Sequence, residues 1–207
     1  MEVVGADGAA VGPGESPLSP SLDLATLGAA YGAGRLTVAG MVETVIARIR
    51  DAGEDGVWIT RVAEEELRRR ARELDARGPA GLPLFGIPFA VKDNIDVAGL
   101  PTTAACPDFA HVPDGTATAV ARLQEAGAVL VGKTNLDQFA TGLVGVRSPY
   151  GVARNPFDAD FVPGGSSSGS AVAVSSGLVS FAFGTDTAGS GRVPAGFNNI
   201  VGLKPTR

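Results

Sequence analysis

Apolar side chains recur every three or four positions over residues 38–49, and this spacing predicts an amphipathic helix. Thr37, just before the first apolar position, is its expected N-cap. The same period returns over residues 63–77 and predicts a second helix, which Gly78 and Pro79 end. The apolar positions are Val38, Met41, Val42, Val45, Ile46 and Ile49 in the first helix and Ala63, Leu67, Ala71 and Leu74 in the second.

Short apolar runs between the helices predict buried strands. The run at 85–91 is one of them, although Pro88 favours an edge position because proline cannot donate to a strand ladder. The other expected elements are strands at 128–131 and 178–183, and helices at 116–126 with Thr116 as N-cap, at 135–141, and at 168–176 after a serine cluster that caps it. Strands that alternate with helices are typical of an α/β fold with a largely parallel sheet.

The composition of the chain excludes several classes of function. With 44% hydrophobic and 19% charged residues, the chain can bury a core. The formal net charge of -5 argues against a basic face for nucleic acid, and the run Arg68-Arg69-Arg70 lies among glutamates, as on a solvated helix. A single cysteine, Cys106, and a single histidine, His111, leave no internal disulfide and no Cys/His metal cluster, so no metal is expected.

Residues 1–20 are rich in Gly, Ala and Pro and are expected to form a loose N-terminal tail. They lack the basic segment followed by an apolar segment that marks a signal peptide. No run of about 18 apolar residues predicts a membrane span. We therefore expect a cytoplasmic protein without membrane partners.

One motif match is misleading. Residues 127–134 fit the phosphate-loop pattern G-x-x-x-x-G-K-[ST], whose four middle residues must form a loop that follows a strand. Here the middle residues, 128–131, are predicted to be a strand themselves, and a helix precedes them. Nucleotide binding is therefore a remote alternative, and Lys133 is instead a candidate partner for a carboxylate.

Serines held in glycine turns dominate residues 163–194, where Ser166-Ser167-Ser168 and Ser190 flank two apolar stretches. A nucleophile elbow G-x-S-x-G is absent around Ser190, and no lysine is preceded by serine in the pattern S-x-x-K. A Ser-His-Asp triad would have to use His111, for which a surface or loop position is the favoured interpretation.

A neutral lysine is the remaining way to activate a serine. Burial lowers the pKa of a lysine by up to roughly 3–5 units, and Lys92 directly follows the apolar run 87–91, where its side chain would be drawn inward. An ordinary lysine at a strand end explains the spacing equally well. Residues 187–191 form a turn of small residues whose backbone N–H groups can converge on an oxyanion, although such turns occur in any α/β protein.

Several separated blocks together resemble the amidase signature family, from about Leu24 to the C-terminus. The blocks are 86–94, 164–170, 184–192 and 202–206, in the order of the family. The resemblance implies a Ser–cis-Ser–Lys triad with Ser190 as nucleophile, Ser166 as bridging serine in a cis peptide and Lys92 as base. It also implies an oxyanion hole made by the backbone N–H groups of Thr187, Ala188, Gly189 and Ser190.

Within the family, residues 135–151 and 184–195 are most similar to allophanate hydrolases. The A-type subunits of amidotransferases and general amidases usually have Gly and Ile where this chain has Ala188 and Gly191. The resemblance implies hydrolysis of a small amide, allophanate, to ammonia and carbon dioxide in urea or cyanurate breakdown. It implies no cofactor and no metal, and it allows a homodimer of the full-length enzyme. Another amidase, an A-type subunit of a glutamyl-tRNA amidotransferase, and an inactive fragment or binding module stay open as alternatives.

The amidase signature domain of the family is longer than this chain. We therefore expect residues 21–207 to be the N-terminal portion of such a domain, with substrate-contacting residues beyond Arg207. The 207-residue chain alone is expected to bury its sheet poorly and to turn over little or no substrate.

Overall fold

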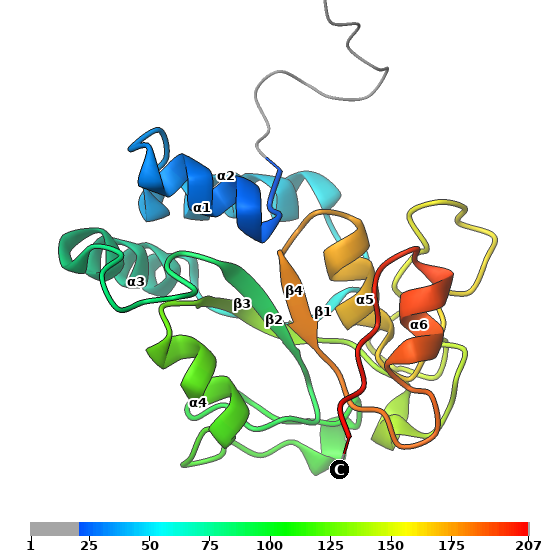
Figure 1. Cartoon of the computed structure of the whole chain (residues 1–207). Helices are drawn as coiled ribbons and strands as arrows, with labels where there is room; N and C mark the ends of the chain where they lie inside the picture. The colour runs from blue at the N-terminus through cyan, green and yellow to red at the C-terminus, as the bar shows by residue number, and fades with distance from the viewer. Residues whose placement is uncertain (1–20, 207) are drawn as a thin grey trace, which may run out of the picture.

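The computed structural model describes residues 21–206, and the predicted tail at 1–20 lies outside the described residues. Helices and strands alternate along the chain (Figure 1). The elements are α1 (Leu24–Gly32), α2 (Val38–Ala52), β1 (Trp58–Arg61), α3 (Glu64–Arg77), β2 (Pro88–Lys92), α4 (Thr118–Glu125), β3 (Val129–Thr134), α5 (Ser168–Ser175), β4 (Phe181–Phe183) and α6 (Arg192–Phe197), with the 3-10 turns η1 (Pro107–Phe109) and η2 (Gln138–Ala140).

Within the described residues, four strands form one mixed sheet in the order β1-β3-β2-β4. β2 is parallel to both β3 and β4, and β1 runs antiparallel to β3. This arrangement confirms the predicted α/β class with a largely parallel sheet. Because β2, β3 and β4 point the same way, their carboxyl ends meet at one edge of the sheet, where open α/β sheets usually bind their ligands.

Helices cover both faces of the sheet. Ala90 of β2 belongs to a core cluster with residues of α1, α2, α3 and α5, whereas its neighbours Phe89 and Val91 belong to a second cluster with Val120 of α4. Figure 1 shows α1, α2 and α3 on one side of the sheet and α4 on the other. The central strands are therefore buried on both faces, as the continuous apolar run before Lys92 predicts.

The two long helices form as their periodicity predicts. The apolar positions expected on the inner face of α2 are buried, and the Thr37 side chain accepts a hydrogen bond from Gly40 N at 3.0 Å. α3 begins one residue after its predicted start and ends at Gly78, whose φ is 76°. Its exposed face holds arginine–glutamate pairs, such as Arg69 with Glu66, so the basic run lies on a solvated surface.

The edge position predicted from Pro88 is wrong, because β2 lies between β3 and β4. Pro88 is the first residue of the strand, where its missing N–H removes no rung from the ladder, and its carbonyl accepts from Ser180 N at 3.0 Å. The strand expected at 178–183 shortens to Phe181–Phe183, since the turn after α5 takes up its first residues.

The helix predicted at 135–141 does not form. It is replaced by the three-residue turn η2, in which Phe139 has a positive φ of 53°. The Asp137 carboxylate accepts from the backbone N–H groups of Gly145 and Arg147, further along the same loop. Side chains that bond the backbone in this way compete with helix formation, which explains the loop.

The predicted N-cap at Thr116 is also wrong. α4 begins at Thr118 after Ala117, and the Thr116 hydroxyl accepts from Ala98 N at 2.9 Å instead. Three elements were not predicted: α1, β1 and α6. Of the four residues of β1, three are partly buried and Arg61 is exposed, so the strand depends on its long-range pairing with β3 rather than on a local signal.

Gly86, two residues before β2, is a position where a side chain will not fit. Its φ is +69°, and a Cβ would lie 2.7 Å from the hydroxyl oxygen of Tyr31 and 2.8 Å from Val38 Cγ2. In the natural protein, Gly86→Ala is expected to lower the free energy of unfolding by about 3 kcal/mol, because left-handed strain and overpacking add together.

Gly34→Ala is the matched control for this prediction. Gly34 has a φ of +64° in the turn after α1 but no atom within 4 Å of its Cβ position, so only the left-handed backbone strain of about 1 kcal/mol is expected. Urea unfolding of both variants measures the difference, and equal losses would show that Gly86 has room for a side chain.

Candidate active site

Lys92 is the last residue of β2 and lies at the carboxyl edge of the sheet. Its side chain is 0% exposed, as the apolar run before it predicts. Nζ lies within hydrogen-bond distance of two hydroxyl oxygens, 2.7 Å from Ser166 Oγ and 2.7 Å from Thr185 Oγ1. In the adjacent strand, Thr134 pairs with Lys92, and its hydroxyl lies 2.7 Å from that of Ser170 in α5. The sheet edge therefore packs against the start of α5.

Burial decides the charge of Lys92. It lowers the pKa of the amine from its ordinary 10.5 to about 7, while the negative charges of Asp137 and Asp186 act in the opposite direction. Among residues 21–206, no carboxylate forms an ion pair with Nζ, and its hydrogen-bond partners are hydroxyl groups. An amine with a pKa near 7 is to a large extent unprotonated at neutral pH, as a general base must be.

Ser166 lies in the loop before α5, and its side chain is fully buried. The Gly165–Ser166 peptide bond is cis, the geometry that the family resemblance implies. Asp137 holds this loop in place, because its backbone N–H donates to Ser166 O at 3.1 Å. Its carboxylate accepts from Gly145 N at 3.0 Å and from Arg147 N at 2.9 Å. A Cβ at Gly165 would clash with that carboxylate, so only glycine fits there.

The two serines after Ser166 start α5 but do not cap it as predicted. Ser167 is in the N-cap position and Ser168 is the first helical residue, yet no side-chain cap bond forms. Instead, the Ser167 hydroxyl donates to Thr185 O at 3.2 Å and accepts from Thr185 N at 3.4 Å. Ser167 therefore ties the start of the helix to the loop after β4.

Ser190 lies in the turn before α6 and is 6% exposed. Its carbonyl oxygen accepts from Ser167 N at 3.1 Å, which brings the turn against the Ser166 loop. Within residues 21–206 the Ser190 hydroxyl forms no hydrogen bond. The structure thus joins Lys92 and Ser166 directly and places Ser190 next to them with its hydroxyl uncommitted.

Asp186 organises the turn that holds Ser190. Its carboxylate accepts from the backbone N–H groups of Gly189 at 2.7 Å, Gly191 at 3.2 Å and Arg192 at 3.1 Å. The guanidinium group of Arg192 pairs with it at 2.9 Å. The hydrogen bond from Arg192, together with these backbone bonds, holds the pKa of Asp186 well below its usual range, so the carboxylate stays charged.

The bonds of Asp186 also decide which expected oxyanion donors are free. The N–H of Gly189 is already donated to Asp186. In the described part of the chain, the N–H groups of Thr187, Ala188 and Ser190 have no hydrogen-bond partner. Three of the four expected donors are therefore available to a negatively charged oxygen.

Lys133 has the carboxylate partner that the sequence predicts. Its fully buried Nζ lies 3.2 Å from Asp93 Oδ1 and donates to Thr102 Oγ1 at 3.0 Å. Burial lowers the pKa of Lys133, and the charge of Asp93 opposes this effect. Residues 129–134 form the strand β3 soon after α4, so the segment does not form the loop that a phosphate site requires.

Within residues 21–206, the side chains of His111 and Cys106 form no hydrogen bond with Lys92, Ser166 or Ser190. His111 is an exposed loop residue whose Nε2 lies 3.7 Å from Asp96 Oδ1, and Cys106 is a free thiol. Over residues 21–206, no group of three or more His, Cys, Asp or Glu side chains is placed to hold a metal ion. The helices of the same range are all too short or too polar to cross a membrane.

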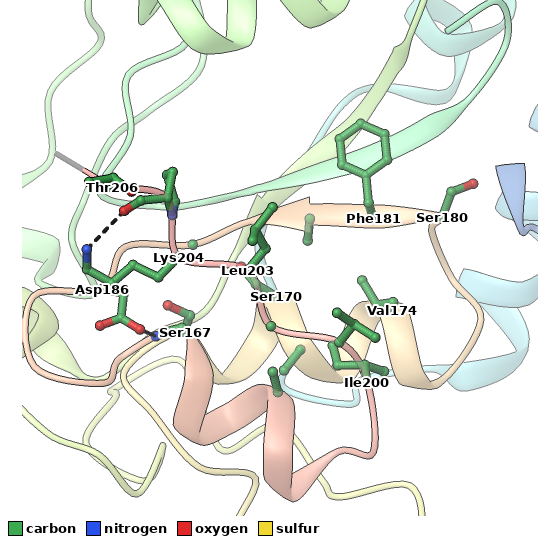
Figure 2. A pocket seen from close by; sticks show the side chains of 18 residues that line it. Ser167, Ser170, Val174, Ser180, Phe181, Asp186, Ile200, Leu203, Lys204 and Thr206 are labelled. Atoms are coloured by element: carbon green, nitrogen blue, oxygen red, sulfur yellow. Dashed lines mark hydrogen bonds between the residues drawn. The ribbon is translucent and has the colours of Figure 1, made fainter.

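A cavity of about 580 Å³ adjoins the cluster, between α5, β4 and residues 200–206. Figure 2 shows Ser167 and Asp186 at one end of this cavity and Ser180 at the other. Lys92 and the two candidate serines do not line it, although Ser167 and Gly191, their neighbours in sequence, do. The cavity therefore lies beside these three candidate residues and does not contain them.

Three side chains of the cluster were not predicted from the sequence: Asp137, Thr185 and Asp186. Asp186 stands in a turn of small residues, and such an acid commonly accepts backbone N–H bonds, which is a signal that was available. The role of Asp137 depends on a loop conformation that has no local signature. Thr185 becomes notable only when β4 brings it beside β2.

The burial of Lys92 has a consequence for stability that can be measured. Unfolded, the amine titrates near 10.5, whereas folded it titrates near 7. Between these values the unfolded chain binds the extra proton, so this residue makes stability rise with pH. Lys92→Met removes the effect, and the stability of the variant relative to the wild type is expected to fall by about 3 kcal/mol from pH 7 to pH 10.

Urea unfolding of the natural protein at the two pH values tests this expectation. Lys204→Met replaces an exposed lysine and is the control, for which the difference from the wild type should not change with pH. If the difference in free energy of unfolding between Lys92→Met and the wild type were also the same at pH 7 and pH 10, the pKa of Lys92 would not be lowered by folding.

Comparisons with known proteins identify relatives of this chain. The chain is 54% identical over 168 residues to the urea amidolyase of Saccharomyces cerevisiae, which covers 81% of this chain and 9% of that protein. It is 48% identical over 191 residues to the A-type subunit of the glutamyl-tRNA(Gln) amidotransferase of Symbiobacterium thermophilum. This match covers 89% of this chain and 39% of that protein. A variant of Kluyveromyces lactis allophanate hydrolase has a similar structure, with a TM-score of 0.80 and 46% identity, over 93% of this chain and 31% of that chain.

The chain thus spans well under half the length of each of these relatives. The Amidase family matches it over residues 40–207, which contain all of the described cluster. The predicted resemblance is confirmed, and the chain belongs to the amidase family.

Proposed function

We propose that this chain carries the catalytic residues of an amide hydrolase, with Ser190 as nucleophile, Ser166 as proton relay and Lys92 as base. The strongest support is the distance of 2.7 Å between Lys92 Nζ and Ser166 Oγ, because both side chains are fully buried. A buried amine with a pKa of about 7 accepts a proton near neutral pH, whereas an exposed lysine is already protonated there.

The reaction begins with two proton shifts. Lys92, as a free amine, takes the hydroxyl proton of Ser166, and Ser166 takes that of Ser190. For this the Ser190 hydroxyl turns towards Ser166, and the bond from Ser167 N to Ser190 O already holds the two loops together. Ser190 Oγ then forms a bond to the amide carbonyl carbon, and the carbonyl oxygen becomes an oxyanion.

The turn before α6 stabilises that oxyanion. Within residues 21–206 the N–H groups of Thr187, Ala188 and Ser190 have no hydrogen-bond partner, so they are free to donate to the developing charge. Each such donor contributes typically about 3–4 kcal/mol. The proton held by Lys92 then returns through Ser166 to the leaving nitrogen, the C–N bond breaks and ammonia departs. Water hydrolyses the acyl-enzyme by the same relay.

We infer a small amide as substrate, with allophanate as the specific candidate and urea-nitrogen release as its role. The support is the similarity to a urea amidolyase and to an allophanate hydrolase, together with the small residues of the serine turn. Gly191 has an ordinary φ of -105°, and the nearest atom to its Cβ position is 3.4 Å away, so packing does not demand glycine there. Its missing side chain leaves space beside the turn.

A glutamine-hydrolysing enzyme component is the second candidate. It is favoured by the 48% identity to the A-type subunit of an amidotransferase over 89% of this chain. The catalytic steps would be the same, because the residues placed in them do not depend on the amide that is cleaved. The two candidates therefore differ only in substrate.

Ser190→Ala and Lys92→Ala are each expected to lower kcat/KM for ammonia release by about 10⁴-fold, since nucleophile and base act as a unit. Ser175→Ala is the matched control, because among residues 21–206 the Ser175 hydroxyl bonds only Val172 O, at the far end of α5. Ammonia release by the natural protein measures all three, with thermal melting as a check on folding. Turnover close to the wild type in either of the first two variants would overturn the scheme.

Substrate preference is a separate prediction. The natural protein is expected to release ammonia from allophanate with a kcat/KM at least about 100-fold above that for glutamine, because polar groups of a site that pairs with allophanate are left unpaired by glutamine. Coupled ammonia assays with both amides give the ratio. A preference for glutamine would leave the triad proposal standing and reverse the choice between the two candidates.

A further inference from the structure

Thr185 occupies the second hydrogen-bond position on Lys92. Its Oγ1 lies 2.7 Å from Nζ, the same distance as Ser166 Oγ on the other side. Asn94 Nδ2 reaches the same hydroxyl at 3.3 Å. The catalytic steps derived above use only the Ser166 side of the amine, so the contact with Thr185 has no role in them.

The Ser167 hydroxyl holds the backbone of Thr185 through both its carbonyl oxygen and its N–H group. The Ser167 hydroxyl donates to Thr185 O at 3.2 Å and accepts from Thr185 N at 3.4 Å. Ser167 is covalently joined to Ser166, which contacts Lys92, and Lys92 contacts Thr185. These four residues form a closed ring of contacts, so the two hydroxyl oxygens are fixed relative to Nζ.

The chemistry of a free amine gives this arrangement a purpose. A neutral lysine has two N–H donors and one lone pair, and it can remove the Ser166 proton only if the lone pair faces Ser166. An acceptor that engages one N–H restricts rotation about the Cε–Nζ bond. Without that acceptor, an N–H can turn to Ser166 and leave no base to receive its proton.

We propose that Thr185 is a positioning residue of the triad, which accepts an N–H of Lys92 and thereby directs the lone pair to Ser166. This rests on the proposed function of Lys92 as base. The same hydroxyl stabilises the protonated amine more than the free amine, because a charged donor makes the stronger hydrogen bond. The charged groups that act on Lys92 are Asp137 and Asp186, and both favour its protonated form in the same way.

Two substitutions in the natural protein test the role of Thr185. Thr185→Val keeps the branched shape and removes the hydroxyl, whereas Thr185→Ser keeps the hydroxyl. Thr44→Val is a control in α2, where the Thr44 hydroxyl, within the described part of the chain, bonds only Gly40 O. The measurements are the pH profile of kcat/KM for ammonia release and the pH titration of the ¹⁵N signal of Lys92 Nζ, assigned with Lys92→Met.

Thr185→Val is expected to lower kcat/KM on the plateau by about 10- to 100-fold, as for the loss of a hydrogen bond to a charged group. The rate rises with pH as Lys92 loses its proton, and this rise should move to lower pH by about one unit, because the ammonium form loses an acceptor. The ¹⁵N titration should shift by the same amount. Thr185→Ser should restore both to within about threefold of the wild type, and Thr44→Val should change neither.

Two results would overturn the positioning role. One is that Thr185→Val has the same pH profile of kcat/KM and the same ¹⁵N titration of Lys92 as the wild type. The other is a lower plateau with an unmoved titration that Thr185→Ser does not restore, since that is the behaviour of a purely structural residue. The ¹⁵N titration needs no substrate, so it decides the contact with Lys92 even if no amide is cleaved. Failure of the proposed function shows separately, as undiminished ammonia release by Lys92→Ala.

Discussion

The site depends on the buried contact between the amine of Lys92 and the hydroxyl of Ser166. It needs a lysine drawn out of water at the end of a strand, and β2 supplies this because it is the strand buried between β3 and β4, with helices on both faces. It also needs a serine brought down onto that strand end, which the loop before α5 provides. Both β2 and the loop before α5 are needed for this contact. Because the packing of helices on both faces of the sheet buries Lys92, the same packing also lowers the pKa of its amine.

Two carboxylates hold the loops that surround this contact, and they do so without touching the amine. The Asp137 carboxylate accepts two backbone hydrogen bonds, from Gly145 and Arg147, while the backbone N–H of Asp137 donates to Ser166 O. The Asp186 carboxylate holds the Ser190 turn through three backbone bonds and the Arg192 pair. Both charges also raise the proton affinity that burial lowers. Loop geometry and base strength are therefore coupled, because either carboxylate, if lost, would disturb both at once.

The sequence predicted those parts of the structure that local patterns specify. The face of α2 and its Thr37 cap follow from a repeat of three and four residues, and the burial of Lys92 follows from the apolar run before it. The patterns failed where long-range contacts or side-chain bonds to the backbone decide the outcome. The helix expected at 135–141 is a loop because Asp137 bonds its backbone, and β1 exists only through its pairing with β3. Thr185 has no local signal because its partner is 93 residues away.

β4 ends the sheet, and within residues 21–206 its outer edge has no strand partner. Residues 200–206 line the same cavity as β4 (Figure 2) but form no strand. Val201 and Leu203 in this segment are exposed. An apolar Phe-Ala-Phe edge with unpaired backbone groups is a template for strand addition by another molecule. Within residues 21–206, β4 is therefore the edge at which a further strand can join the sheet.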